Sequence, residues 1–134
     1  ITNIDITPES IKFLKERGEA GVIGDVFKLP VREGVLDGIM AVNLINTSVA
    51  MDREDLDGVF KEINRVLKDK GHFIQSHFGY YVQPIPRDEQ LLAVEESGFG
   101  NIQLIQNELT SELAYLEPLA FIAEKTQNNS GQSN

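Results

Sequence analysis

The chain has 134 residues, of which 41% are hydrophobic and 25% charged, a composition typical of one globular domain. Its 12 basic and 21 acidic residues give a formal net charge of -9, which disfavours binding to nucleic-acid phosphates. No apolar run approaches the roughly 20 residues of a membrane helix, so no membrane partner is expected. The absence of cysteine excludes disulfides and thiolate chemistry, and it fits a reducing, cytoplasmic compartment.

The first predicted unit is a short strand followed by a helix. Residues 1–6 alternate apolar and polar side chains and are rich in β-branched types, which is typical of a strand. Thr7 is a suitable helix N-cap, Pro8 suits the first helical position, and Gly18 ends the helix. Asp5 is therefore expected at the end of a strand, just before a capped helix.

Two further strands are predicted on either side of a loop. Residues 20–24 form a short strand, and Asp25 follows at its end. Leu29-Pro30 breaks regular structure in the loop. Residues 36–44 are almost continuously apolar, which is typical of a strand buried on both faces of a parallel sheet. A loop between two such strands is a common place for ligand contacts in α/β proteins.

The second half of the chain continues the alternation of helices and strands. Residues 52–69 have apolar side chains at helical spacing, with Asp52 as a plausible N-cap and Gly71 as the terminating residue. The elements predicted after this helix are strands at residues 72–78, 101–108 and 119–124 and a helix at residues 88–97. The last two strands are expected to pair antiparallel, because no helix of sufficient length is obvious between them.

Residues 1–125 are therefore predicted to form one α/β domain with a mostly parallel sheet and an antiparallel C-terminal strand. Residues 126–134 are polar and rich in Gly, Ser, Asn and Gln, so a disordered tail is expected there.

Five short segments share an order and spacing with one known family. They are Asp5 after its strand, Gly24-Asp25 with Leu29-Pro30, Leu36-Asp37, residues 62–71 (EINRVLKDKG) and residues 96–99 (ESGF). Together they resemble class I S-adenosylmethionine-dependent methyltransferases, and most of all the type 11 set that acts on small molecules. The resemblance implies a Rossmann-like sheet, S-adenosylmethionine as the cofactor, and methyl transfer to a small-molecule acceptor.

The resemblance also implies a first strand and a GxGxG turn that precede the strand of Asp5 and lie at the centre of the sheet. The only Gly-X-Gly of the chain is at residues 98–100, after a predicted helix, where it cannot form this turn. The chain is therefore expected to be the C-terminal part of a methyltransferase, without the first strand and its helix, and inactive on its own. Exposed sheet edges invite pairing, so a homodimer is also expected.

The resemblance assigns five cofactor-binding residues. Asp5 accepts hydrogen bonds from both ribose hydroxyls, and Ile6 lies against the adenine. Asp25 accepts from the adenine amino group, with the backbone amide of Val26 nearby, and Asn43 lies under the sulfonium. The alternatives are an exposed or helix-capping acid for Asp5, core packing for Ile6, and a loop-capping role for Asp25.

The catalytic residues are less defined. A general base is needed only if the acceptor must lose a proton, and His77 is the candidate, with an ordinary partly buried histidine as the alternative. Asp37 begins a strand, so it is expected to fix a turn. Two histidines and no cysteine disfavour a metal site.

Two other functions stay open. One is a methyltransferase-like domain that no longer catalyses and serves in assembly or regulation. The other is a nicotinamide-dinucleotide oxidoreductase, against which the segment from Asp25 to Pro30 and the antiparallel ending argue.

Overall fold

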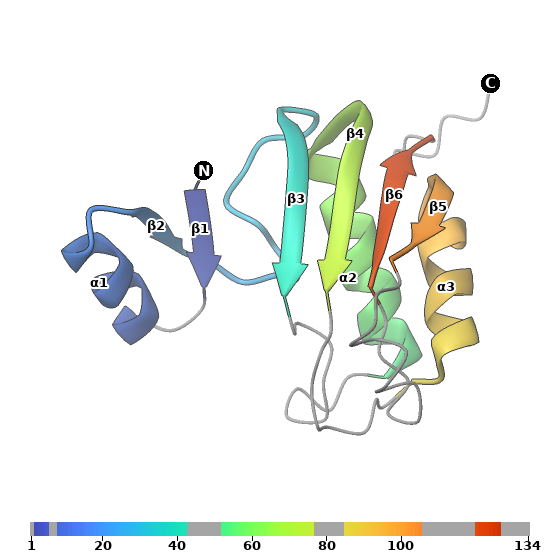
Figure 1. The fold of residues 1–134 in the computed structure, drawn as a ribbon, viewed down its shortest axis with the longest axis horizontal. Helices are drawn as coiled ribbons and strands as arrows, with labels where there is room; N and C mark the ends of the chain where they lie inside the picture. The colour runs from blue at the N-terminus through green and yellow to red at the C-terminus, as the bar shows by residue number, and fades with distance from the viewer. Residues whose placement is uncertain (1, 6–7, 43–51, 77–84, 106–119, 127–134) are drawn as a thin grey trace.

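The computed structural model describes residues 2–5, 8–42, 52–76, 85–105 and 120–126 (Figure 1). Its elements are β1 (Thr2–Asp5), α1 (Pro8–Glu16), β2 (Ala20–Ile23), β3 (Leu36–Val42), α2 (Arg53–Val66), β4 (Leu67–Ser76), α3 (Arg87–Glu96), β5 (Phe99–Leu104) and β6 (Phe121–Lys125). Helices and strands alternate as predicted over most of this order. Within these ranges, every helix is too short or too polar to span a membrane.

The described strands form two hydrogen-bonded groups. β1 and β2 pair in parallel, with Asp5 opposite Ile23. The other four form a sheet in the order β3-β4-β6-β5, in which β3 and β4 are parallel and β6 runs antiparallel to both of its neighbours. The predicted antiparallel pairing of the last two strands is thus confirmed. In Figure 1, β1 and β3 point the same way but are separated in space, and no hydrogen-bonded pairing joins these two described strands.

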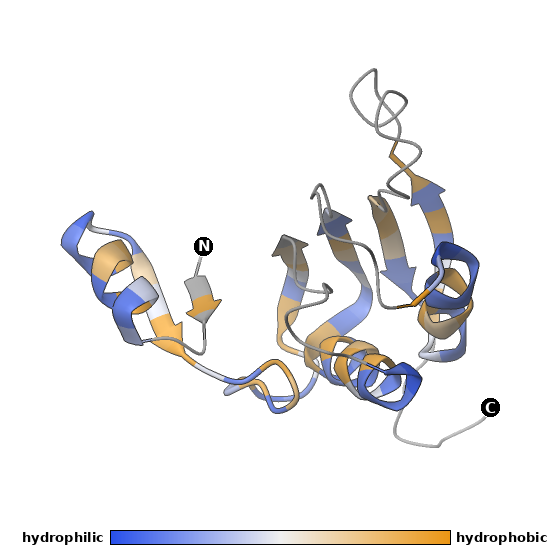
Figure 2. Ribbon diagram, turned by 90° about the horizontal axis from the view of Figure 1, so that it is seen from below, coloured by the Kyte–Doolittle hydropathy of each residue, from blue (hydrophilic) through white to orange (hydrophobic). Residues whose placement is uncertain are grey.

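The core lies between the four-stranded sheet and the helices α2 and α3, which cover one of its faces (Figure 2). Its centre is the fully buried Phe73 of β4, whose ring lies 5.3–5.6 Å, centroid to centroid, from those of Phe60, Phe99 and Phe121. Burying a phenylalanine side chain contributes about 1.5–3 kcal/mol, so this cluster from four elements is a large part of what holds the sheet to its helices.

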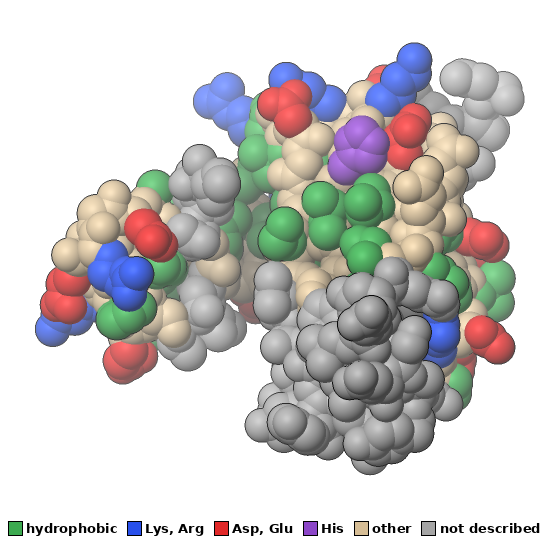
Figure 3. All heavy atoms as spheres, in the orientation of Figure 1, with side chains coloured by type: hydrophobic (Ala, Val, Ile, Leu, Met, Phe, Trp, Pro, Cys, Tyr) green, Lys and Arg blue, Asp and Glu red, His purple; other side chains and the backbone are tan. Residues whose placement is uncertain are grey.

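The opposite face of this sheet carries an apolar row. Met40, Ile74 and Ile122 are register partners on β3, β4 and β6, and register partners point to the same face. Figure 3 shows hydrophobic side chains gathered on this face. Met40 is 66% exposed, so the described residues leave this end of the row uncovered.

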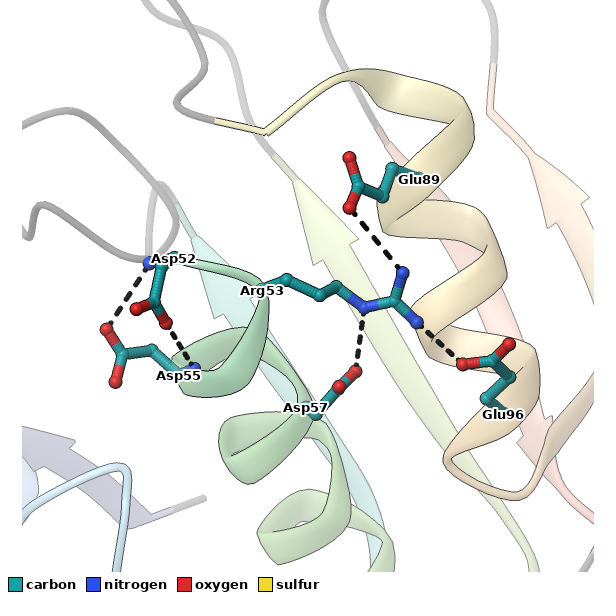
Figure 4. Close-up of polar contacts among 6 residues, drawn as sticks. All are labelled: Asp52, Arg53, Asp55, Asp57, Glu89 and Glu96. Carbon is teal, nitrogen blue, oxygen red and sulfur yellow. Dashed lines mark hydrogen bonds and ion pairs between the residues drawn. The ribbon is translucent and has the colours of Figure 1, made fainter.

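Helix α2 begins as predicted. The side chain of Asp52 accepts a hydrogen bond from the backbone N–H of Asp55 at 2.8 Å, and the side chain of Asp55 accepts one from the N–H of Asp52 at 3.3 Å (Figure 4). This reciprocal capping box satisfies two backbone donors that have no partner within the helix.

The predicted end of this helix was wrong. α2 ends at Val66, and Leu67 already has extended backbone and begins β4. Leu67 fits the helical spacing, but it is fully buried as the register partner of Leu36 in the sheet. Gly71 lies inside β4 instead of ending a helix. A Cβ there would meet the carbonyl oxygen of Lys68 at 2.8 Å, so glycine permits a close backbone approach.

Candidate functional site

The carboxyl ends of the parallel strands share one edge of the molecule. β1 ends at Asp5, β2 at Ile23, β3 at Val42 and β4 at Ser76, and Figure 1 shows the arrowheads of β1, β3 and β4 at the same edge. In open α/β sheets, ligands bind in the crevice outside these strand ends. The predicted acids, Asp5 at the end of β1 and Asp25 just after β2, both belong to this edge.

Asp25 opens a tight turn. Its Oδ1 accepts a hydrogen bond from the N–H of Phe27 at 2.9 Å, and its carbonyl oxygen accepts one from the N–H of Lys28 at 3.0 Å. Asp25 is exposed, whereas Val26 packs against the core. The loop-capping role is therefore present in the structure. Because a carboxylate accepts several hydrogen bonds, this role leaves acceptor capacity for a ligand.

Gly24 allows the turn to approach β1 closely. A Cβ at this position would lie 2.8 Å from Cγ2 of Ile4 and 2.8 Å from Cδ of Pro30. Both distances are far shorter than an ordinary contact between carbon atoms. Only glycine therefore lets the end of β1, the Asp25 turn and Pro30 pack together as they do.

A pair of side chains on α2 holds the far side of this loop. Oε2 of Glu62 accepts a hydrogen bond from the N–H of Leu29 at 2.5 Å, and Nη2 of Arg65 donates one to the carbonyl oxygen of Leu29 at 3.2 Å. Glu62 and Arg65 also bind each other through two hydrogen bonds of 2.6 and 2.9 Å. Arg65 lowers the pKa of the Glu62 carboxyl, burial opposes this shift, and the N–H of Leu29 adds to the lowering.

The backbone at the end of α2 holds the other end of the loop. The carbonyl oxygens of Arg65 and Val66 accept hydrogen bonds from the N–H groups of Gly34 and Val35, at 2.8 and 3.0 Å. The last carbonyls of a helix have no partner within it, so the loop supplies one. The sequence predicted α2 but none of these contacts with the loop. The one available signal was an acid three residues before an arginine on the same helix.

Three of the predicted site residues, Ile6, Asn43 and His77, lie outside the described residues, as does the side chain of Asp5. Asn43 directly follows β3 and His77 directly follows β4. Both positions in the chain therefore follow strand ends at the same edge as Asp5.

Asp37 belongs to the other end of β3. Its side chain is 91% exposed and pairs only with Nζ of Lys68, at 3.1 Å, among the described residues. This position lies away from the strand ends at which the ligand is expected, and the turn-fixing role expected for Asp37 stays a prediction.

Gln75 is a polar residue at this edge that the sequence did not single out. It lies one residue before the end of β4, it is 1% exposed, and its side-chain amide makes no hydrogen bond with any described residue. A buried amide without a partner costs free energy, so Gln75 is a position where polar contact is either absent or supplied by groups outside the described residues.

The parallel strands, the acids at the ends of two of them and the close turn at Gly24 define an α/β domain whose strand ends share one edge, the edge at which open α/β sheets bind ligands. A family model described as "Methyltransferase domain" matches residues 1–75, which is more than half of the chain. The chain therefore belongs to the methyltransferase-domain family. A search among curated proteins found no match.

Solved structures share the fold. A S-adenosylmethionine-dependent methyltransferase from Methanosarcina mazei superposes with a TM-score of 0.70 at 13% identity, over 93% of this chain and 81% of that one. A protein from Pyrococcus horikoshii gives 0.69 at 18% identity, over 95% and 71%. A S-adenosylmethionine-dependent methyltransferase from Archaeoglobus fulgidus gives 0.69 at 15% identity, over 92% and 75%. The predicted Rossmann-like fold of class I methyltransferases is thus confirmed.

Proposed function

We propose that this protein transfers a methyl group from S-adenosylmethionine to a small-molecule acceptor. The observation that carries the proposal is the pair of acids at the ends of neighbouring parallel strands, Asp5 as the last residue of β1 and Asp25 just after β2, with Gly24 packing the turn of Asp25 against β1. Membership of the methyltransferase-domain family supports methyl transfer in general. The acceptor is proposed to be small because the sequence resembles the type 11 set, which acts on small molecules, and the net charge disfavours nucleic acid.

We propose that the residues at this edge bind the adenosine part of the cofactor. Asp5 is proposed to accept both ribose hydroxyls, since one carboxylate can take two donors, and Ile6 to lie against the adenine. The exposed carboxylate of Asp25 is proposed to accept from the adenine amino group, beside the N–H of Val26. Asp25 keeps this capacity even while Oδ1 fixes its own turn.

The protein's task in this reaction is mainly to hold and align the reactants. S-adenosylmethionine, when bound, supplies a methyl group already activated by its sulfonium. Holding an acceptor in line with that methyl accounts for much of the acceleration available. We propose that Asn43, after β3, lies beneath the donor group. His77, after β4, is the proposed base for an acceptor that must lose a proton.

Calorimetry with the full-length protein tests the proposal. S-adenosylmethionine is expected to bind the unsubstituted protein and to lose its affinity in Asp5→Ala. Asp37→Ala is the matched control, because Asp37 is also a strand acid but pairs only with Lys68 among the described residues, away from this edge. Unchanged affinity in Asp5→Ala would contradict the ribose assignment. Absence of binding to the unsubstituted protein would favour a non-catalytic assembly or regulatory role.

We also propose that a second copy of the chain covers the open part of the sheet. β1 and β3 are each hydrogen-bonded on one side only among the described strands, and such edges invite another strand. The exposed Met40 adds apolar surface beside the open edge of β3. Light scattering is expected to find a dimer, and a monomer at all concentrations tested would contradict this part of the proposal.

A further inference from the structure

We infer that Glu62 and Arg65 are positioning residues for the loop between β2 and β3, residues 24–35. They fix the turn of Asp25 from the side of α2, so that the Asp25 carboxylate meets the adenine in one geometry. The inference rests on the proposed function. Neither side chain is placed against the cofactor, so neither is a catalytic residue. Their action is through the backbone of Leu29.

The contacts satisfy both backbone groups of one residue. Leu29 is 8% exposed, and a backbone N–H and C=O at such a position need partners. Glu62 takes the N–H, and Arg65 supplies a donor to the C=O, which also accepts a hydrogen bond from the N–H of Val31 at 2.8 Å. The two side chains are fixed in turn by their own pair of hydrogen bonds, in which the planar guanidinium binds both carboxylate oxygens. The backbone at Leu29 is therefore held at two points by a rigid pair.

Leu29 is connected to Asp25 by a very short path. Lys28, its neighbour, donates its N–H to the carbonyl oxygen of Asp25 and forms an isolated bridge with it. Phe27, which donates to the Asp25 carboxylate, passes close to α2, since a Cβ at Gly58 would lie 3.8 Å from its ring. A shift at Leu29 would therefore be passed to the turn, and with it to the carboxylate proposed to bind adenine.

The charges of the pair suit this role. The carboxyl of Glu62 is 11% exposed and its pKa is lowered by the hydrogen bonds from Arg65, so it is ionised at neutral pH. A hydrogen bond to an ionised group is stronger than one between neutral groups. An acid at position 62 thus holds the N–H of Leu29 more firmly than an amide could.

A second arginine on the same helix provides a matched control. Arg53 binds Asp57 at 3.0 Å and reaches Glu89 and Glu96 of α3 at 3.7 and 2.6 Å (Figure 4). It is a comparable arginine–carboxylate cluster, but among the described residues its partners lie on α2 and α3, and none belongs to the loop of Asp25. Its removal weakens the packing of α2 on α3 without removing a described contact of that loop.

The test is calorimetric binding of S-adenosylhomocysteine to the full-length protein and to Glu62→Ala, Glu62→Gln and Arg53→Ala. Glu62→Ala is expected to raise Kd about tenfold, the factor that corresponds to one charge-assisted hydrogen bond. Glu62→Gln keeps an oxygen that can accept from the N–H of Leu29, so it should recover part of this loss. Arg53→Ala should bind as the unsubstituted protein does. Amide exchange at Lys28 and Leu29, measured without ligand, should accelerate most in Glu62→Ala, less in Glu62→Gln, and not in Arg53→Ala.

Three outcomes would overturn the inference. Glu62→Ala binding with unchanged affinity would show that the loop needs no support from α2. An equal loss in Arg53→Ala would mean that both variants act through general stability. Failure of the unsubstituted protein to bind would contradict the proposed function itself, and it would be recognised before any variant is compared.

Discussion

Replacing Gly24 by alanine tests the close packing of the site most sharply. The new methyl group would lie 2.8 Å from Ile4 and 2.8 Å from Pro30, about 1 Å short of an ordinary carbon–carbon contact. The Cδ of Pro30 belongs to a ring fused to the backbone, so relief requires the loop itself to move. Overpacking of this kind costs about 1–3 kcal/mol. The free energy of unfolding should fall by that amount, and affinity for S-adenosylhomocysteine should fall with it.

Urea unfolding followed by circular dichroism measures the loss. Gly38→Ala is the control, because Gly38 lies in β3, the strand that follows the loop. A Cβ at Gly38 would meet only the carbonyl oxygen of His72, at 3.5 Å, which is an ordinary contact. Gly38→Ala should leave stability within about 0.5 kcal/mol of the original protein. If Gly24→Ala is as stable as Gly38→Ala and binds equally well, a side chain larger than that of glycine does fit between β1 and the loop.

Three further changes probe the core, the buried amide and the loop contact. Phe73→Ala should lower the free energy of unfolding by about 3–5 kcal/mol, since it removes the ring that contacts three others. A loss under about 1 kcal/mol, measured by urea unfolding, would contradict a core centred on Phe73. Gln75→Leu should raise the thermal midpoint, because an amide without a described partner is replaced by an apolar side chain; lower stability would show that Gln75 is hydrogen-bonded after all. The pKa of Glu62 is lowered from 4.5 in the folded state, so its stabilising contribution is present above that pH and lost as the pH falls through the lowered value. The stability gap between the original protein and Glu62→Gln should therefore be present at pH 7 and shrink at acid pH, and a gap that widens there would contradict this sign.

The sequence predicted those elements whose signals are local. The apolar spacing and the Asp52 cap of α2, and the continuous apolar run of β3, depend on neighbouring residues, and both elements are found close to where they were expected. The expected burial of β3 on both faces was wrong for the described residues, because β3 is an edge strand of its sheet and Met40 is 66% exposed. The residues after Val66 were predicted as helix, because Leu67 continues the spacing. Pairing of Leu67 with Leu36, 31 positions earlier, makes them a strand instead. That contact depends on tertiary structure and is not readable from local pattern.

The same limit applies to the site. The positions of Asp5 and Asp25 after strands followed from the alternation of apolar segments and turn residues. The contacts of Glu62 and Arg65 with Leu29 did not, because they join residues 33 and 36 positions apart. They arise from how α2 packs against the loop. The sequence therefore predicted the proposed ligand-binding acids but not the residues that hold one of them in place.

The most direct test of the account is an experimental structure with S-adenosylhomocysteine bound. The ligand is expected in the crevice at the carboxyl ends of the parallel strands, with its ribose hydroxyls on the Asp5 carboxylate and its adenine amino group on Asp25. The turn from Asp25 to Lys28 and its contacts with α2 should be preserved. A ligand bound elsewhere, or at this edge without contact to either acid, would contradict the proposed site.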